Sequence, residues 1–199
     1  IPLFALWALA WAMLFVSPLC AASMALFSAR VAQHILLTLV AAPLIALALP
    51  RVRMPALPLA GLFALLFWGW HAPGPYAATL QSDIVYWAMH LSLTGSAIAL
   101  FTAIAAAPER ALPAAGLTGA QLTFYAVLIT LSPEPWHAWH VTHAVPFGLS
   151  GLADQQLAGG LMWVAGGAAF MAAIAAFAWR FLRLQDDGPR PQDFPRTRT

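Results

Sequence analysis

The sequence contains no lysine and few charges of any kind. Charged residues make up 8% of its 199 residues and hydrophobic residues 62%, whereas a soluble domain carries roughly 25% charged residues. All nine basic residues are arginines, and they form no basic tract of the kind that binds nucleic acid. This composition predicts an integral membrane protein, whose surroundings are the lipid bilayer.

Residues for covalent or acid–base catalysis are equally scarce. Cys20 is the single cysteine, which excludes an internal disulfide and a Cys-x-x-Cys metal or redox motif. The chain has no Gly-rich phosphate loop, no Ser-His-Asp order and no paired-carboxylate motif. Because these residues and motifs are missing, we predict that the protein is not an enzyme. The centres of its apolar segments also carry no charge, which argues against a proton or ion transporter.

Long apolar runs dominate what is present. A helix needs about 20 apolar residues to cross the hydrocarbon core, and proline and turn residues divide the chain into about six such segments. We predict an all-α bundle forming one domain over residues 1–183. The expected membrane helices cover residues 1–16, 30–49, 57–70, 84–106, 117–131 and 157–181. The first has no basic n-region or cleavage pattern before it, so we interpret it as a membrane helix and not a signal peptide. Residues 184–199 are polar and predict a disordered tail.

The arginines indicate how this bundle is oriented. In the six-helix arrangement only Arg30 falls on one side. The other side receives Arg51, Arg53, Arg110, Arg180, Arg183 and the tail arginines. The positive-inside rule makes the crowded side cytoplasmic, so both termini are expected in the cytoplasm. The outer side then receives the connections 17–29, 71–83 and 132–156, of which the last is the longest.

This orientation places all six histidines in the outer half of the protein. His34, His71 and His90 lie near the outer ends of three different predicted helices. Imidazole is the commonest protein ligand for transition metals and suits copper and zinc. The three would form a metal site only if their helices pack together. Otherwise they would make ordinary hydrogen bonds between helices.

A second group of histidines, His137, His140 and His143, lies in the longest outer connection. Their spacing of three would place them on one helical face, but the neighbouring prolines make a long helix there improbable. Aromatic residues at a membrane interface explain the segment equally well. These three and Cys20 are therefore weaker metal candidates. The outer half also holds the soft donors Met24, Met89 and Met162, which favour Cu(I) when they bind a metal, although methionine more often serves packing.

An acid and two amides directly precede the last apolar segment. Asp154 lies three residues before the predicted helix start at Leu157, where a carboxylate is favoured by the helix dipole and by free N–H groups. It would therefore be a helix cap or one wall of an outer site. Gly159 and Gly160 lack side chains and would let a neighbouring helix approach closely.

Four segments form a recognisable set in this order. They are Gln33-His34-Ile35-Leu36-Leu37 with Ala42-Pro43-Leu44, His71-Ala72-Pro73 with Tyr76, His90, and the run from Asp154 to Val164 with Gly166-Gly167. Together they resemble the CtaG family of cytochrome c oxidase assembly factors, of the polytopic membrane type, with its signatures QHLLL…APLL and DQQLAGLIMWVPGG.

The resemblance implies a multi-pass protein of the bacterial plasma (inner) membrane with its histidine-bearing loops on the periplasmic face. Its expected role is to assist maturation of a haem–copper oxidase by binding or delivering copper. The expected partners are an oxidase subunit or a copper chaperone. Position by position, the resemblance favours His34, His71 and His90 as ligands. Further members of the site would be Asp154, Gln155, Tyr86 and Met89.

The sequence departs from the family's usual pattern at two positions. Many members carry a histidine four residues before each of two ligand histidines, and here these positions are Arg30 and Tyr86. Arginine does not ligate metals. Either His34, His71 and His90 form a reduced site, or the task of the protein has changed, or the loop histidines act as replacements.

Other functions fit the same sequence. The protein could be a scaffold for oxidase assembly that binds no metal. Less favoured are a copper transporter and a b-type cytochrome with His34 and His90 as axial ligands.

Overall fold

The computed structural model describes residues 18–50 and 53–186, and this part of the chain is helical with no β-strand. The expected helix at residues 1–16 and most of the expected tail lie outside the described residues. Two compact units are distinguished, one ending at Gly166 and the other beginning at Gly167. The first unit contains every candidate site residue and is described below. The second contains the continuation of the last helix.

The second predicted membrane helix is a continuous but irregular segment, Phe27–Ala48. It consists of α3 (Phe27–Ile35), the π-helical turn η1 (Leu36–Ala41) and α4 (Ala42–Ala48). Pro43 has no N–H to bond the carbonyl four residues earlier, and the N–H of Ala42 reaches back five residues to Leu37. The irregular turn therefore lies directly before the proline. A short helix, α2 (Pro18–Ala25), precedes it where the sequence predicted only a connection.

Two of the next helices, α5 (Ala56–His71) and α7 (Asp83–Ala106), follow the predictions closely, within one residue of expectation at each end. Between them lies α6 (Pro73–Gln81), which forms a 71° bend with α5. Ala72 is extended and Pro73 starts the new helix, as expected for proline in a first turn. The connection 71–83, which was expected on the outer side, is thus mostly helical. After the 3₁₀ turn η2 (Pro108–Arg110), α8 covers Leu112–Leu131 and begins five residues before the predicted 117.

The largest departure from the predictions is in the connection 132–156. It contains α9 (Ala138–His143) and the 3₁₀ turn η3 (Val145–Phe147), and α10 (Gly151–Asp186) begins inside it. The Ser150 side chain accepts a hydrogen bond from the N–H of Ala153 and caps α10. The predicted helix start at Leu157 and helix end at 181 were therefore wrong. Asp154 lies in the first turn of α10 and not before it.

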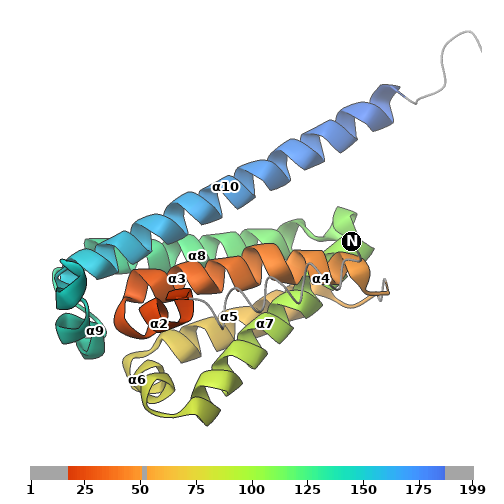
Figure 1. Cartoon of the computed structure of the whole chain (residues 1–199). Coiled ribbons are helices and arrows are strands. Elements are labelled where there is room, and N and C mark those ends of the chain that lie inside the picture. The colour runs from red at the N-terminus through yellow and green to blue at the C-terminus, as the bar shows by residue number, and fades with distance from the viewer. Residues whose placement is uncertain (1–17, 51–52, 187–199) are drawn as a thin grey trace, which may run out of the picture. The chain divides into compact units, whose positions relative to one another are not determined.

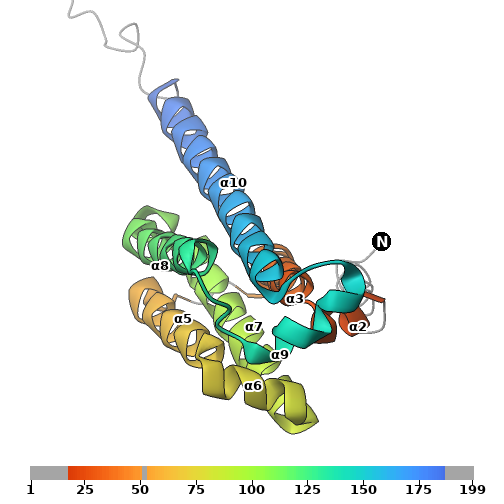
Figure 2. The same cartoon turned by 90° about the vertical axis from the view of Figure 1, so that its left-hand side faces the viewer.

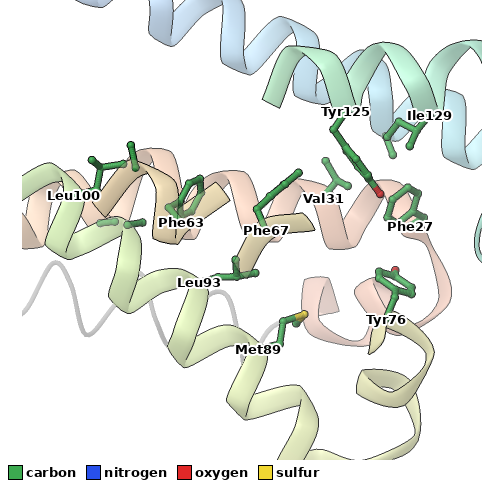
Figure 3. Close-up of a cluster of buried hydrophobic side chains, with 14 of the residues drawn as sticks. Phe27, Val31, Phe63, Phe67, Tyr76, Met89, Leu93, Leu100, Tyr125 and Ile129 are labelled. Atoms are coloured by element: carbon green, nitrogen blue, oxygen red, sulfur yellow. The ribbon is translucent and has the colours of Figure 1, made fainter. Parts of the chain in front are cut away.

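Within the first unit, α7 packs against both α4 and α5, and α5 packs against α8 (Figures 1 and 2). Their core is aromatic and aliphatic. Figure 3 shows Phe63 and Phe67 of α5, Leu93 of α7 and Tyr125 of α8 among its buried side chains. Among the described residues, three helices are long and apolar enough to cross a membrane, and the bent pair α5–α6 would count as a fourth. The protein is therefore a multi-pass helical membrane protein.

Candidate functional site

The candidate residues gather at one end of the first unit. There α3 and α7 begin and α5 and α8 end, and the short helices α2, α6 and α9 lie around these ends (Figures 1 and 2). The turn η2 joins α7 to α8 and therefore lies at their other ends, and Arg110 belongs to it. Successive long helices run in opposite directions, so helix beginnings and helix ends meet at the same end of the unit.

The structure brings His34, His71 and His90 together although they come from α3, α5 and α7. The ring centroid of His34 lies 5.0 Å from that of His90 and 5.9 Å from that of His71. His34 thus lies at the centre of the group. His71 is held in place from its other side, where it stacks on Phe67 at 4.2 Å.

Two of these rings are oriented by backbone carbonyls one helical turn earlier. Nδ1 of His71 lies 2.7 Å from the oxygen of Phe67, and Nδ1 of His90 lies 3.0 Å from the oxygen of Tyr86. A ring nitrogen bonded to a carbonyl must carry the proton, so in the neutral ring Nε2 keeps its lone pair. Histidines that ligate metals usually have this arrangement. The Nε2 of His34 is buried without a hydrogen-bond partner.

These donors do not form a ready-made chelate. Among the residues that the structure describes, no group of three or more His, Cys, Asp or Glu side chains is arranged to hold a metal ion. The chemistry of the three imidazoles suits a borderline or soft cation. A site built from them needs at least one further donor or a small rearrangement.

A cavity of about 40 Å³ lies beside this histidine cluster, and His34 and His71 contribute to its wall while His90 does not. Most of its lining is apolar, including Phe63, Phe67 and Leu93. Among the described residues, the other lining side chains with a polar atom or a sulfur atom are Thr38 and Met162. This lining is typical of a small-molecule or ion site, with few polar groups in an apolar wall.

Arg30 lies one turn before His34 and is only 1% exposed. One nitrogen, Nη2, donates to Thr79 Oγ1 at 2.7 Å, while Nε and Nη1 have no hydrogen-bond partner. The guanidinium carbon lies 5.0 Å from the ring centre of Tyr76 and 5.6 Å from that of Tyr86. These cation–π contacts offset part of the cost of burial. The sequence predictions did not assign Arg30 to the site, although an arginine inside an apolar helix is itself a signal.

Asp154 is fully buried and caps a helix other than its own. Its carboxylate accepts hydrogen bonds from the backbone N–H groups of Phe27 and Ser28, at 2.6 and 3.0 Å, and from the Ser28 hydroxyl. These are the first N–H groups of α3, which the helix cannot satisfy itself. Asp154 thus acts as a cap and as a wall of this end of the protein, and it ties α10 to the helix that carries His34.

Gln155, the next residue, forms hydrogen bonds through its side-chain amide with three backbone groups of neighbouring segments. Its Oε1 accepts from the N–H of Trp136 at 2.7 Å, and its Nε2 donates to the oxygens of Ile129 and Glu134 at 3.0 and 3.2 Å. The amide therefore connects the end of α8 to the segment that leads into α9.

Tyr86 and Met89 lie on α7, four residues and one residue before His90. The Tyr86 ring lies 4.2 Å from that of His90. Met89 is 1% exposed and belongs to the hydrophobic core. Cys20, on α2, is partly buried and has a free thiol.

The loop histidines do not form one face. His140 is buried, and both of its nitrogens are engaged, Nδ1 with the oxygen of Ala25 at 2.8 Å and Nε2 with the hydroxyl of Tyr76 at 2.7 Å. His143 is exposed and stacks on Trp139 at 4.1 Å. His140 therefore connects α9 to α2 and α6, and His143 faces outward.

His137 is buried before α9 and stacks on Tyr76, with ring centroids 3.8 Å apart. Neither ring nitrogen has a hydrogen-bond partner. Burial is the largest cause that lowers the pKa of His137 to about 3, and the neighbouring His71, His140 and Arg30 contribute to the same shift. Burial likewise lowers the pKa of His140. Both rings are therefore neutral at physiological pH.

The fold and this site define a multi-pass helical membrane protein with a buried histidine cluster at one end. A family model for the cytochrome c oxidase caa3 assembly factor, CtaG, matches residues 52–184. Because the match covers most of the chain, the protein belongs to this family, whose assembly role implies no catalysis. His71, His90 and Asp154 fall inside the matched region, and His34 precedes it. No curated protein and no solved structure matches the chain.

Proposed function

We propose that the protein assists the assembly of a haem–copper cytochrome c oxidase by holding copper, as cargo, at His34, His71 and His90. The observation that carries the proposal is the convergence of three histidines from three helices, with ring centroids 5.0 and 5.9 Å apart around His34. Backbone carbonyls orient two of the rings through Nδ1, so that Nε2 carries the lone pair of the neutral ring, and Nε2 of His34 is buried without a hydrogen-bond partner.

The charge around this cluster favours the lower oxidation state of copper. Arg30 is buried one turn from His34, and its positive charge opposes a second cation in proportion to that cation's charge. Asp154, the buried acid at this end, is engaged by the α3 N-terminus. A monovalent ion bound by neutral imidazoles is therefore the favoured cargo.

In the proposed arrangement six helices cross the bacterial plasma membrane. The proposal adds α10 to the described spans and keeps the expectation from the sequence of a further span at residues 1–16, and it places both termini in the cytoplasm because the arginines concentrate on that side. The histidine cluster then opens toward the periplasm. There it would receive copper from a chaperone or pass it to an oxidase subunit.

The test is complementation in a strain that lacks the gene. The triple variant His34→Ala, His71→Ala, His90→Ala is expected to reach the membrane but to leave the oxidase deficient in copper, while wild type restores it. His143→Ala, on the exposed stacked histidine, serves as the matched control and is expected to restore the oxidase. Normal oxidase copper content with the triple variant would contradict the proposal.

The second candidate is a scaffold that holds an oxidase subunit and binds no metal. Its supporting observation is Arg30, whose buried charge stands close to the histidines and disfavours cations. This function predicts that the triple variant is fully active. The b-type cytochrome is less favoured, because the rings of His34 and His90 lie too close together, at 5.0 Å, to flank a porphyrin.

A further inference from the structure

The cavity beside the histidine cluster has a sulfur donor in its wall. His34 and His71 line it from α3 and α5, and Met162 lines it from α10. A cavity needs about 10–15 Å³ of accessible space to hold one water molecule, and this one offers about 40 Å³. An ion can therefore enter it without displacing a side chain.

Met162 reaches this cavity because α10 packs tightly on α8. A Cβ atom at Gly159 would lie 2.0 Å from Thr130 Oγ1 and 2.9 Å from the carbonyl oxygen of Ala126, both on α8. Ala158, the residue before Gly159, is fully buried. Met162 follows Ala158 by four residues and therefore shares its face of the helix. The small residues of α10 thus direct the thioether inward.

The nitrogen and sulfur donors that face the cavity are borderline or soft. The one hard donor among the described lining residues is the Thr38 hydroxyl, which donates to the backbone oxygen of His34 at 2.6 Å, and none of these residues has a carboxylate or amide side chain. Hard cations such as Mg²⁺ and Ca²⁺ require oxygen ligands. Thioether and imidazole ligands together favour Cu(I).

We propose that Met162 completes a two-histidine, one-thioether site for Cu(I) with His34 and His71 inside this cavity. The inference rests on the proposed function and deepens it by naming a ligand and an oxidation state. A group of this kind contains only two His, Cys, Asp or Glu side chains, so it is consistent with the absence of a three-membered group of those types among the described residues.

This assignment gives His90 a different role from the other two histidines. His90 contacts His34, with ring centroids 5.0 Å apart, but does not line the cavity. It therefore lies behind His34 as seen from the cavity and is not a ligand of an ion inside it. Loss of Met162 is expected to weaken Cu(I) binding more than loss of His90.

The first experiment is a competition titration of the full-length, detergent-purified protein with Cu(I) and a chromophoric Cu(I) chelator under anaerobic, reducing conditions. Met162→Leu, which keeps the apolar volume, is expected to bind Cu(I) at least ten-fold more weakly than wild type. Met171→Leu changes an exposed methionine on the same helix and is expected to bind like wild type.

The second experiment can be decided on the wild-type protein, and the variant only identifies the source of the signal. X-ray absorption at the copper edge of the Cu(I)-loaded selenomethionine protein is expected to show a selenium neighbour, which disappears in Met162→Leu. Absence of a selenium neighbour in wild type overturns the inference even if the leucine variant does not fold. Unchanged affinity in a folded Met162→Leu protein also overturns it.

The outcomes distinguish a failure of the Met162 assignment from a failure of the proposed copper-holding function. If wild type binds no Cu(I), or the triple histidine variant binds as well as wild type, the proposed function fails. If binding depends on His34 and His71 but no selenium neighbour is found, the copper-holding function stands and the role of Met162 is wrong.

Discussion

The carboxylate of Asp154 accepts a hydrogen bond from the backbone N–H of Phe27, 127 residues earlier in the chain. The same carboxylate binds the N–H and hydroxyl of Ser28. One buried acid on α10 thus caps the helix that presents His34. The geometry of the candidate site depends on this cap as much as on the histidines.

Replacement of Asp154 by alanine is expected to destabilise the protein. Two backbone N–H groups would lose their acceptor in a buried place, and each buried unsatisfied group costs about 1–3 kcal/mol. We expect a loss of about 2–4 kcal/mol in the free energy of unfolding. Asp154→Asn keeps one carbonyl oxygen and is expected to lose less.

Denaturant unfolding in detergent micelles measures both Asp154 variants. Asp83→Ala is the control, because Asp83 is an exposed acid in the first turn of another helix, α7. Equal stability of Asp154→Ala and Asp83→Ala would show that the cap contributes nothing.

Replacement of Gly159 by alanine tests the contact between α10 and α8. The added Cβ would overlap Thr130 Oγ1 and crowd the Ala126 oxygen. Overpacking of this kind costs about 1–3 kcal/mol. Gly160→Ala meets no atom within 4 Å and is expected to be neutral or slightly stabilising, since alanine is the better helix former.

The thermal midpoint in micelles distinguishes the two glycine variants. Adding Thr130→Ala removes the nearest clash and is expected to restore part of the loss in Gly159→Ala. Equal midpoints for Gly159→Ala and Gly160→Ala would contradict the close approach of the helices.

Neutralisation of Arg30 is expected to strengthen copper binding. Arg30 is 1% exposed and stands one turn from His34, and in a medium of low dielectric its charge repels a bound cation. Arg30→Gln should therefore raise the Cu(I) affinity about ten-fold, which corresponds to about 1.4 kcal/mol. The competition titration measures this change. An unchanged or weaker affinity in a folded variant would mean that the charge does not act on the site.

Acidification is expected to destabilise the protein through His137. The pKa of this ring is lowered from 6.5 to about 3 in the folded state, chiefly by burial. The unfolded chain therefore binds a proton that the folded protein excludes, and stability falls as the pH drops from about 6.5 toward 3, by up to about 1.4 kcal/mol per pH unit for one proton. His137→Gln should reduce this slope between pH 6 and 4.5.

His143→Gln is the matched control for this pH series, because it makes the same substitution at an exposed histidine of the same segment. If His137→Gln and wild type have the same slope, the excluded proton belongs to another group.

The sequence predicted the long apolar helices well, because their length and hydrophobicity are local properties. The helices at 57–70 and 84–106 agree with α5 and α7 to within a residue. The start of α10 was placed too late, because the polar run of Asp154 and Gln155 was taken to precede the apolar helix. Their polar groups are satisfied by α3, α8 and the following loop, which are distant in the sequence.

The candidate site was predictable in part. The shared sidedness of His34, His71 and His90 was visible in the sequence, and the packing of α3, α5 and α7 brings them together. The loop histidines read as a possible triad, but His140 bonds Tyr76 and Ala25 while His143 faces outward. The place of Met162 in the cavity wall depends on how α10 packs on α8, which no local pattern reveals.

The most direct test of the central claim is the copper content of the purified, Cu(I)-loaded protein after removal of loosely bound metal. The account predicts about one copper per chain in wild type, and none when His34, His71 and His90 are all replaced by alanine. Copper retained by a folded triple variant, or no copper in wild type, would contradict it.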